Sequence, residues 1–239
     1  AKALSFNAKV LIMDEPTSAL TDSEAFATLD TLNLAHNKLG DLARLESGHT
    51  PSRSHPDWWG GDVSWISLTE IRALDGQWVE ATQIKTNAAG IANSSARMLP
   101  RGTVCFSRTA SVGFVTIMAN PMATSQDFVT WTCGEGLNPE FLLHSLRAMR
   151  HYLLGYLSMG STHKTIYFPD LMDLRIAMPS ATQQRTAVQA VNAAAVERNS
   201  LTRALTRQVD LLREFKQSLV TAAVTGDLDV TTAGSGIPG

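Results

Sequence analysis

The chain has 239 residues, of which 44% are hydrophobic and 18% charged, which is typical of a globular protein and excludes a disordered one. Its formal net charge of −2 argues against a protein that coats nucleic acid by charge alone. No apolar run approaches the length of about eighteen residues that a membrane helix needs, and we find no secretory signal pattern. The two cysteines, Cys105 and Cys133, lack metal-type spacing, so we expect buried thiols in a reducing cytoplasm.

The first element in chain order is residues 10–22, which read VLIMDEPTSALTD. Four apolar residues lead to Asp14 and Glu15, a pattern typical of a buried strand that delivers carboxylates to a magnesium–nucleotide site. Over about residues 1–25 the sequence resembles the Walker B segment of ABC-transporter ATPases, especially sugar importers. The resemblance implies that Asp14 would hold the Mg²⁺ shell and that Glu15 would polarise the attacking water.

The phosphate-binding loop of such an ATPase, G-x-x-x-x-G-K-[ST], does not occur in the sequence. Without this loop, no nucleotide phosphate would be held beside the carboxylates of Asp14 and Glu15. We therefore expect residues 1–37, including a short helix predicted at 22–38, not to form a functional domain. An ATP-binding fragment of an ABC sugar transporter stays as the alternative function.

From Lys38 onward the chain is dense in Gly, Pro, Ser and Trp, which is typical of short strands joined by ordered loops. Residues 138–157 carry apolar side chains at helical spacing, with Asn138 as a suitable N-cap and Pro139 at the first helical position. Residues 170–178 indicate one more strand or a short turn. Further strands are predicted at 63–66, 78–84, 103–107, 112–119 and 127–132.

Residues 180–224 contain no Gly and no Pro, and apolar side chains recur at steps of three or four. This pattern predicts one helix of roughly 40 residues and about 60 Å, which Ser180 or Thr182 could cap and Gly226 could end. A helix of this length must protrude, pair with another helix, or both. Its proposed pairing stripe consists of Leu201, Leu205, Val209, Leu212 and Leu219. We expect residues 227–239 to be a flexible tail.

Three separated segments resemble the specificity (S) subunits of type I restriction–modification enzymes. ARLESGHTPSRSHPDWWGGDVSWISLTEI is similar to the opening of a target-recognition domain, and GSTHKTIYFPDLMDLRIAMPSATQQRTAV to its closing segment. LLREFKQSLVTAAVTGDLDV resembles the end of the spacer helix. The resemblance covers about residues 38–230, in the order that the family has.

This resemblance implies a DNA reader without catalytic residues or a cofactor of its own. Such subunits usually hold two recognition domains and two antiparallel helices, each domain reading one half of a split site. Methyltransferase (M) subunits supply adenine methylation, and a motor-nuclease (R) subunit cuts. With one domain and one helix, this chain corresponds to half the pattern, either a half-subunit that dimerises or a truncated or chimeric product. Neither Asn120-Pro121-Met122 nor Asn138-Pro139-Glu140 completes an adenine-methyltransferase motif.

The expected contacts with double-stranded DNA come from hydroxyls, ammonium groups and guanidinium groups that can reach phosphates or base edges. Trp58, Trp59 and Trp65 are better explained as core or loop anchors than as stacking platforms, and His49 and His55 lack a third metal ligand. The candidate DNA-binding residues are Arg97, Arg101, Arg108, Ser161, Thr162, His163 and Lys164.

The sequence thus predicts an α+β fold in which a strand-rich target-recognition domain, residues 38–179, precedes a coiled-coil-type spacer or dimerisation helix, residues 180–226. The expected function is sequence-specific DNA recognition in the cytoplasm, as all or half of a specificity subunit. The expected partners are DNA, M and R subunits and a second copy of the chain through the long helix, without a membrane or a metal.

Overall fold

The computed structural model describes residues 36–157 and 165–227, with the side chains of residues 156 and 157 excepted. Three predicted features lie outside these residues: the Walker-like segment, most of the helix at 22–38, and the tail from residue 228. Residues 36–38 of that predicted helix form a strand instead, β1 (His36–Lys38). They form it because a strand much later in the chain pairs with them, which no local pattern reveals.

The chain divides into two compact units, residues 1–191 and 192–239, and the division falls within the long helix α8 (Ala181–Thr225). All described strands lie in the first unit, which is called the recognition unit below. The described part of the second unit is the remainder of α8 with Gly226 and Asp227. Gly226 adopts a φ of +83° just after the helix, as its predicted role at the end of the helix requires.

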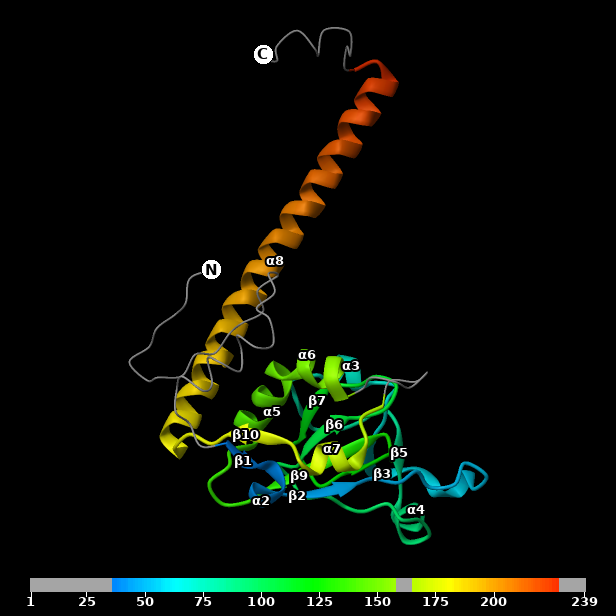
Figure 1. Cartoon of the computed structure of the whole chain (residues 1–239). Helices are drawn as coiled ribbons and strands as arrows, with labels where there is room; N and C mark the ends of the chain where they lie inside the picture. The colour runs from blue at the N-terminus through cyan, green and yellow to red at the C-terminus, as the bar shows by residue number, and fades with distance from the viewer. Residues whose placement is uncertain (1–35, 158–164, 228–239) are drawn as a thin grey trace. The chain divides into compact units, whose positions relative to one another are not determined.

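A five-stranded sheet with the order β2–β9–β6–β7–β4 forms the centre of the recognition unit (Figure 1). Neighbouring strands are antiparallel except for β7 and β4, which are parallel. Every residue of β6 and β7 is buried, so both faces of the sheet centre are covered. The strands are β2 (Ala43–Ser47), β9 (Phe128–Cys133), β6 (Val104–Ser107), β7 (Val115–Met118) and β4 (Trp78–Val79).

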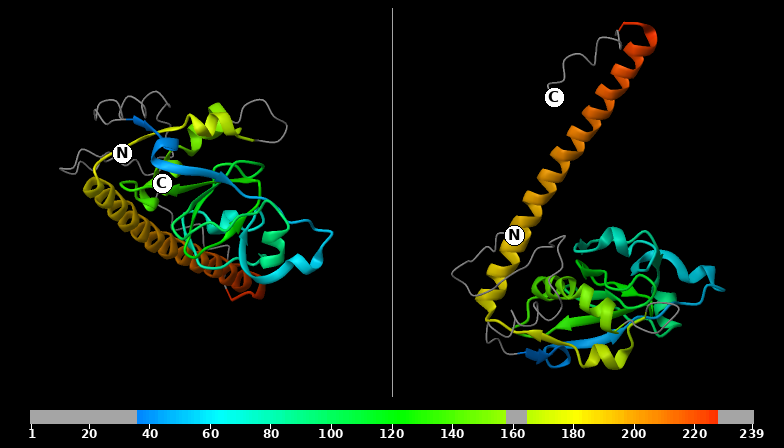
Figure 2. Two further views of the ribbon diagram at one scale, coloured as in Figure 1. Left: turned by 90° about the horizontal axis from the view of Figure 1, so that it is seen from below. Right: turned by 45° about the horizontal axis from the view of Figure 1, so that its top comes forward.

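Two smaller sheets complete the strand arrangement. In the first, β3 (Trp59–Ile66) lies between antiparallel β5 (Lys85–Thr86) and parallel β8 (Ala123–Thr124). In the second, β1 pairs antiparallel with β10 (Arg175–Ala177). Both views in Figure 2 show β1 in blue beside β10 in yellow. This pairing joins the beginning and the end of the described recognition unit.

The helices of the recognition unit are short, apart from α5 (Pro139–Ala148). Asn138 caps α5 as predicted, because its side-chain oxygen accepts hydrogen bonds from the backbone N–H groups of Glu140 and Phe141 at 2.8 and 3.1 Å. The predicted helix at 138–157 continues from α5 as α6 (Arg150–Tyr152) and a π-helical turn (Leu153–Leu157). The others are α2 (Leu39–Leu42), α3 (Ile71–Leu74), α4 (Ala88–Ala92), α7 (Phe168–Met172) and a 3-10 turn, Pro56–Trp58.

Two hydrophobic clusters lie on opposite faces of the central sheet. On one face, Val104 and Phe106 of β6 pack with Trp131 and with the buried leucines of α5. On the other face, Cys105 packs with a cluster that includes Ile71 of α3. Adjacent residues of β6 enter different clusters because side chains alternate along a strand. The α+β class with a long C-terminal helix is confirmed.

A polar cluster around Asp75 connects the helices to strand β7 of the central sheet. Its carboxylate accepts hydrogen bonds from Nη2 of Arg150 at 2.7 Å and from the backbone N–H of Val115 at 2.9 Å. Arg147 approaches the same carboxylate at 3.4 Å, and Nε of Arg150 donates to the carbonyl of Gly113 at 2.7 Å. The cluster therefore ties residues of three distant segments into one arrangement.

Candidate nucleic-acid interface

The three arginines predicted to contact DNA lie at different places on the recognition unit. Arg97 is exposed and forms an ion pair with Glu46 of β2 at 3.2 Å. Arg101 lies near β4, with its guanidinium 5.5 Å from the ring of Trp78. β2 and β4 are the two edges of the five-stranded sheet, four strand spacings or about 19 Å apart. The structure therefore does not gather Arg97 and Arg101 into one patch.

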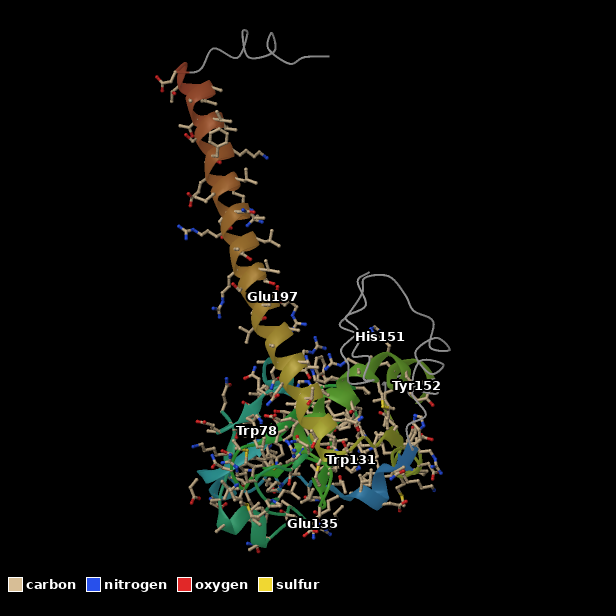
Figure 3. All side chains as sticks on the ribbon, turned by 90° about the vertical axis from the view of Figure 1, so that its left-hand side faces the viewer. Trp78, Trp131, Glu135, His151, Tyr152 and Glu197 are labelled. Carbon is tan, nitrogen blue, oxygen red and sulfur yellow. The ribbon has the colours of Figure 1, made fainter. Side chains whose placement is uncertain are left out.

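Arg101 and its neighbours form a small polar group beside β4. Nη1 of Arg101 donates to the carbonyl of Ala119 at 3.3 Å. The indole N–H of Trp78 donates to Glu140 at 2.6 Å, and Trp78 keeps 38% of its surface exposed (Figure 3). This arrangement leaves other N–H groups of Arg101 free to bind an acceptor, so its proposed role at a base edge is compatible with the geometry.

Arg108 follows β6 and is half-buried. Its guanidinium lies 5.0 Å from the ring of Phe168 in α7, and its Nε is buried without a hydrogen-bond partner among the described residues. The neighbouring Thr109 forms an isolated bridge with Thr165. The other four candidates, Ser161, Thr162, His163 and Lys164, lie outside the described residues, in the segment that ends at Thr165.

A second group of side chains, which the sequence analysis underestimated, lies on the loop Ser52–Trp59, called the aromatic loop below. The guanidinium of Arg53 lies 3.7 Å from the ring of Trp59 and 5.4 Å from the ring of Trp65. His55 and Trp58 stack at 4.1 Å with nearly parallel rings. Trp65 is buried, whereas Arg53 and His55 are exposed. The loop therefore combines a rigid aromatic base with an exposed cation.

The aromatic loop is fixed to its neighbours by hydrogen bonds to its backbone. The carbonyl of Trp58 accepts from the hydroxyl of Thr86 at 2.7 Å, and the carbonyl of Asp57 accepts from the amide of Asn87 at 2.7 Å. Gly61 is required beside it, because a Cβ there would lie 2.6 Å from Cβ of Asn87 and 2.8 Å from the carbonyl oxygen of Thr86. The sequence Trp-Gly-Gly thus allows β3 to approach β5 closely at a bulge.

The root of α8 is held in the recognition unit by a buried polar side chain. Gln184 is fully buried, and its Oε1 accepts the N–H of Asn138 at 2.8 Å. Its Nε2 donates to the carbonyls of Gly136 and Pro179 at 2.8 and 3.0 Å. Sequence analysis missed this residue, although its four-residue spacing from the buried Val188 placed it on the apolar face of the helix.

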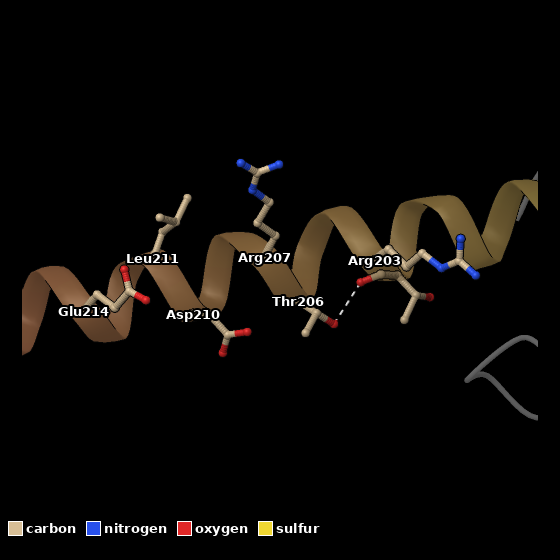
Figure 4. Close-up of a pocket in the computed structure, with 7 residues that line it drawn as sticks. Arg203, Thr206, Arg207, Asp210, Leu211 and Glu214 are labelled. Atoms are coloured by element: carbon tan, nitrogen blue, oxygen red, sulfur yellow. Dashed lines mark hydrogen bonds between the residues drawn. The ribbon is translucent and has the colours of Figure 1, made fainter.

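Beyond Val191, α8 carries the predicted leucine-rich stripe. All five of its side chains are exposed, from 41% at Leu219 to 66% at Leu212. Figure 4 shows a more polar side of the same helix, with a shallow hollow whose walls come from α8 alone. One helix cannot enclose a small molecule, so the hollow is not assigned to a ligand. It is lined by Thr202, Arg203, Thr206, Arg207, Asp210, Leu211 and Glu214.

The described residues give no support for metal binding, thiol chemistry or a membrane-spanning helix. No three His, Cys, Asp or Glu side chains gather in residues 36–157 and 165–227 as a metal site would require. Burial raises the pKa of Cys133 to about 12 and raises that of Cys105 further, which makes both thiols poor nucleophiles. No helix in the same ranges is long and apolar enough to cross a membrane.

Comparison with protein-family models decides the family. Residues 34–209 match the model of the type I restriction modification DNA specificity domain. The chain belongs to this family. The match includes all the described strands and more than half of α8.

Similar proteins carry corresponding names. The chain is 28% identical over 150 residues to the type I restriction enzyme MjaIX specificity subunit of Methanocaldococcus jannaschii, covering 62% of this chain and 34% of that protein. It is 26% identical over 144 residues to the HindI specificity subunit of Haemophilus influenzae, covering 59% and 31%. The aligned part is thus about a third of the length of either relative.

Two solved structures have a similar fold. One, from a study of complex assembly and conformational transition of a type I R-M system, matches with a TM-score of 0.64 and 18% identity. The other, the HsdS subunit of Thermoanaerobacter tengcongensis, matches with a TM-score of 0.56 and 17% identity. Each match covers 90% of this chain and about half of the solved chain, 49% and 48% respectively.

Proposed function

We propose that this chain recognises a DNA sequence as all or half of the specificity subunit of a type I restriction–modification complex. The observation that carries the proposal is the family match over residues 34–209, which includes both the strand-rich unit and a long part of α8. In this proposal residues 38–179 are the target-recognition domain and residues 180–226 the spacer helix. A cytoplasmic location would follow from this function.

The chain would direct chemistry that its partners perform. Asn138, which begins an Asn-Pro sequence, is engaged in capping α5 and is therefore not available as a methyltransferase residue. We propose that M subunits methylate adenine and that an R subunit cleaves, as the family resemblance implies. The net charge of −2 favours weak binding by the chain alone, because little affinity comes from counterion release.

The test is a selection of duplexes from a random pool by the chain reconstituted with its M subunit. We expect one preferred sequence to emerge and to bind more tightly than the starting pool. Equal binding of selected and random duplexes would refute sequence recognition. Lys164→Ala should weaken binding to all sequences if Lys164 contacts a phosphate, whereas substituting Arg101 or Arg108 should relax the preference at one base pair.

We further propose that two copies of the chain pair through α8. On a helical wheel of about 100° per residue, the leucine-rich stripe lies on one side, while Arg203, Arg207 and Glu214 lie on the opposite side. Burying each stripe side chain against a partner would contribute on the order of 1.5–3 kcal/mol. With an antiparallel second copy, one recognition unit would lie at each end of the helix pair. The two units would then bind the two halves of a split, near-palindromic DNA site.

Sedimentation tests this pairing. The unmutated chain should be dimeric at tens of micromolar, and Leu205→Asp with Leu212→Asp should make it monomeric. Thr206→Asp with Gln217→Asp is the matched control, because it adds two carboxylates away from the stripe. A monomeric unmutated chain, or equal dissociation by both double variants, would contradict the homodimer.

A further inference from the structure

Arg53 differs from the arginines chosen by sequence reasoning in what surrounds its guanidinium. Arg97 has a carboxylate partner, Arg101 donates to a carbonyl, and Arg108 is half-buried. Arg53 is exposed and, among the described residues, has neither an ion pair nor a hydrogen bond to its guanidinium. Its guanidinium lies against the indole rings of Trp59 and Trp65.

We propose that Arg53 binds a phosphate of the DNA backbone and that the aromatic loop presents it. This inference rests on the proposed function and adds a contact residue to it. A guanidinium has five N–H donors, and stacking on an indole occupies the face of the group while its edge stays available. That edge can donate two parallel hydrogen bonds to the oxygens of a phosphodiester.

The loop reduces the entropy that an exposed arginine would lose on binding. The indole N–H of Trp59 donates to the carbonyl of Ser52 at 3.2 Å, which closes the loop at its two ends. The hydroxyls of Ser52 and Ser54 lie 2.7 Å apart on either side of Arg53. Since the platform and the backbone are already ordered, the guanidinium has fewer states to lose when it meets a phosphate.

Nearby negative charge does not cancel the cation. Asp57, the acidic residue of the aromatic loop, lies 3.8 Å from Nδ1 of His55, and among the described residues no ion pair within 4 Å joins Arg53 to a carboxylate. Within the same loop, the imidazole of His55 is stacked nearly parallel on the ring of Trp58. Among the described residues, no ion pair therefore neutralises Arg53.

The experiment titrates the full chain into a fluorescently labelled random-sequence duplex, by anisotropy, between about 50 and 200 mM salt. Because a phosphate contact is independent of sequence, Arg53→Ala should weaken binding about tenfold at the lowest salt. It should also reduce the slope of log K against log salt by about 0.9. Arg53→Lys should keep the slope, because an ammonium still neutralises one phosphate.

Arg72→Ala is the matched control. Arg72 is also exposed and lies near an aromatic ring, 5.6 Å from Phe114, but it belongs to α3 and not to the aromatic loop. The Arg72→Ala variant removes the same charge from the chain and should leave the affinity for the duplex and the slope of log K against log salt nearly unchanged. A loss in Arg53→Ala that exceeds the loss in Arg72→Ala supports the proposal.

The outcomes separate this inference from the proposed function. If the unmutated chain binds the random duplex and Arg53→Ala binds it equally well, Arg53 is not a phosphate contact, while sequence recognition stands. If Arg53→Ala weakens binding to a selected duplex only, the residue reads a base and the phosphate assignment is wrong. If the unmutated chain reconstituted with its M subunit binds neither random nor selected duplex at low salt, both proposals fail.

Discussion

Replacement of Gln184 tests how the first turns of the long helix α8 are held in the recognition unit. Gln184→Ala removes three hydrogen bonds to the backbone from a fully buried site: one from the N–H of Asn138 and two to the carbonyls of Gly136 and Pro179. Each bond contributes about 1 kcal/mol net, and a buried N–H without a partner costs about 1–3 kcal/mol. The variant should therefore lose about 2–4 kcal/mol of unfolding free energy.

The neighbouring Gln183 provides the control. Its side-chain oxygen accepts the N–H of Ser180 at 2.9 Å, and the hydroxyl of Ser180 accepts the N–H of Gln183 at 3.4 Å, which together form a capping box. This pair is exposed, so water can replace the lost bond in Gln183→Ala, and the cost should be about 0.5–1 kcal/mol.

The assay is urea unfolding followed by tryptophan fluorescence, since Trp131 is fully buried in the core of the recognition unit. The expected order of stability is unmutated chain, Gln183→Ala, Gln184→Ala. The reasoning is wrong if the free energy of unfolding of Gln184→Ala lies within about 0.5 kcal/mol of that of the unmutated chain, or if both variants lose the same free energy. The buried amide would then not hold the first turns of α8.

Three further outcomes are expected. The purified chain should show no magnesium-dependent ATP turnover, since the sequence has no phosphate-binding loop. ATP turnover that is lost in Glu15→Gln would contradict this expectation. The half-buried Cys133, whose pKa is raised to about 12, should react slowly with a thiol reagent at pH 8 until denaturant is added; labelling of the native chain as fast as that of the unfolded chain would contradict the raised pKa. The hydrogen bond from Lys38 lowers the pKa of Asp173, so Lys38→Met should return it to its ordinary range in an NMR titration. The stability from this pair is complete above the ordinary pKa of Asp and is lost as pH falls through the lowered one.

The strongest local patterns in the sequence predicted their elements well. The strands at 103–107 and 127–132 correspond to β6 and β9, because both are buried runs rich in β-branched and aromatic residues. Residues 170–178 contain both the end of a short helix and the strand β10. The long helix was predicted within a few residues, since nothing in 180–224 interrupts it.

Other predicted elements were too long, because side chains compete for the backbone. The predicted strand at 78–84 ends at Val79. Beyond it, the hydroxyl of Thr82 accepts the N–H of Trp65 and donates to the carbonyl of Ile84, and Glu70 accepts the N–H of Gln83. Such side-chain bonds replace those of a strand ladder, and periodicity does not reveal them.

The candidate contacts were predicted less well, because they depend on tertiary structure. Arginines near short strands were reasonable candidates, but the sheet order places Arg97 and Arg101 by opposite edges. Arg53 lies over Trp59, and the bulge in β3 that follows Trp59 requires pairing with β5. An isolated sequence window does not contain that pairing.

The long helix changes character along its length, and this change suggests a division of labour. Its first turns bury Gln184, Ala187 and Val188 within the recognition unit, so they belong to the fold of that unit. From Asn192 onward, large apolar side chains such as Leu205 and Leu212 are 61% and 66% exposed. Substitutions in the first part should therefore reduce the stability of the recognition unit, whereas substitutions in the stripe should act on association. A helix that leaves such a stripe in water gains little stability from packing. The second part of α8 should therefore be stabilised more by a partner than the first part.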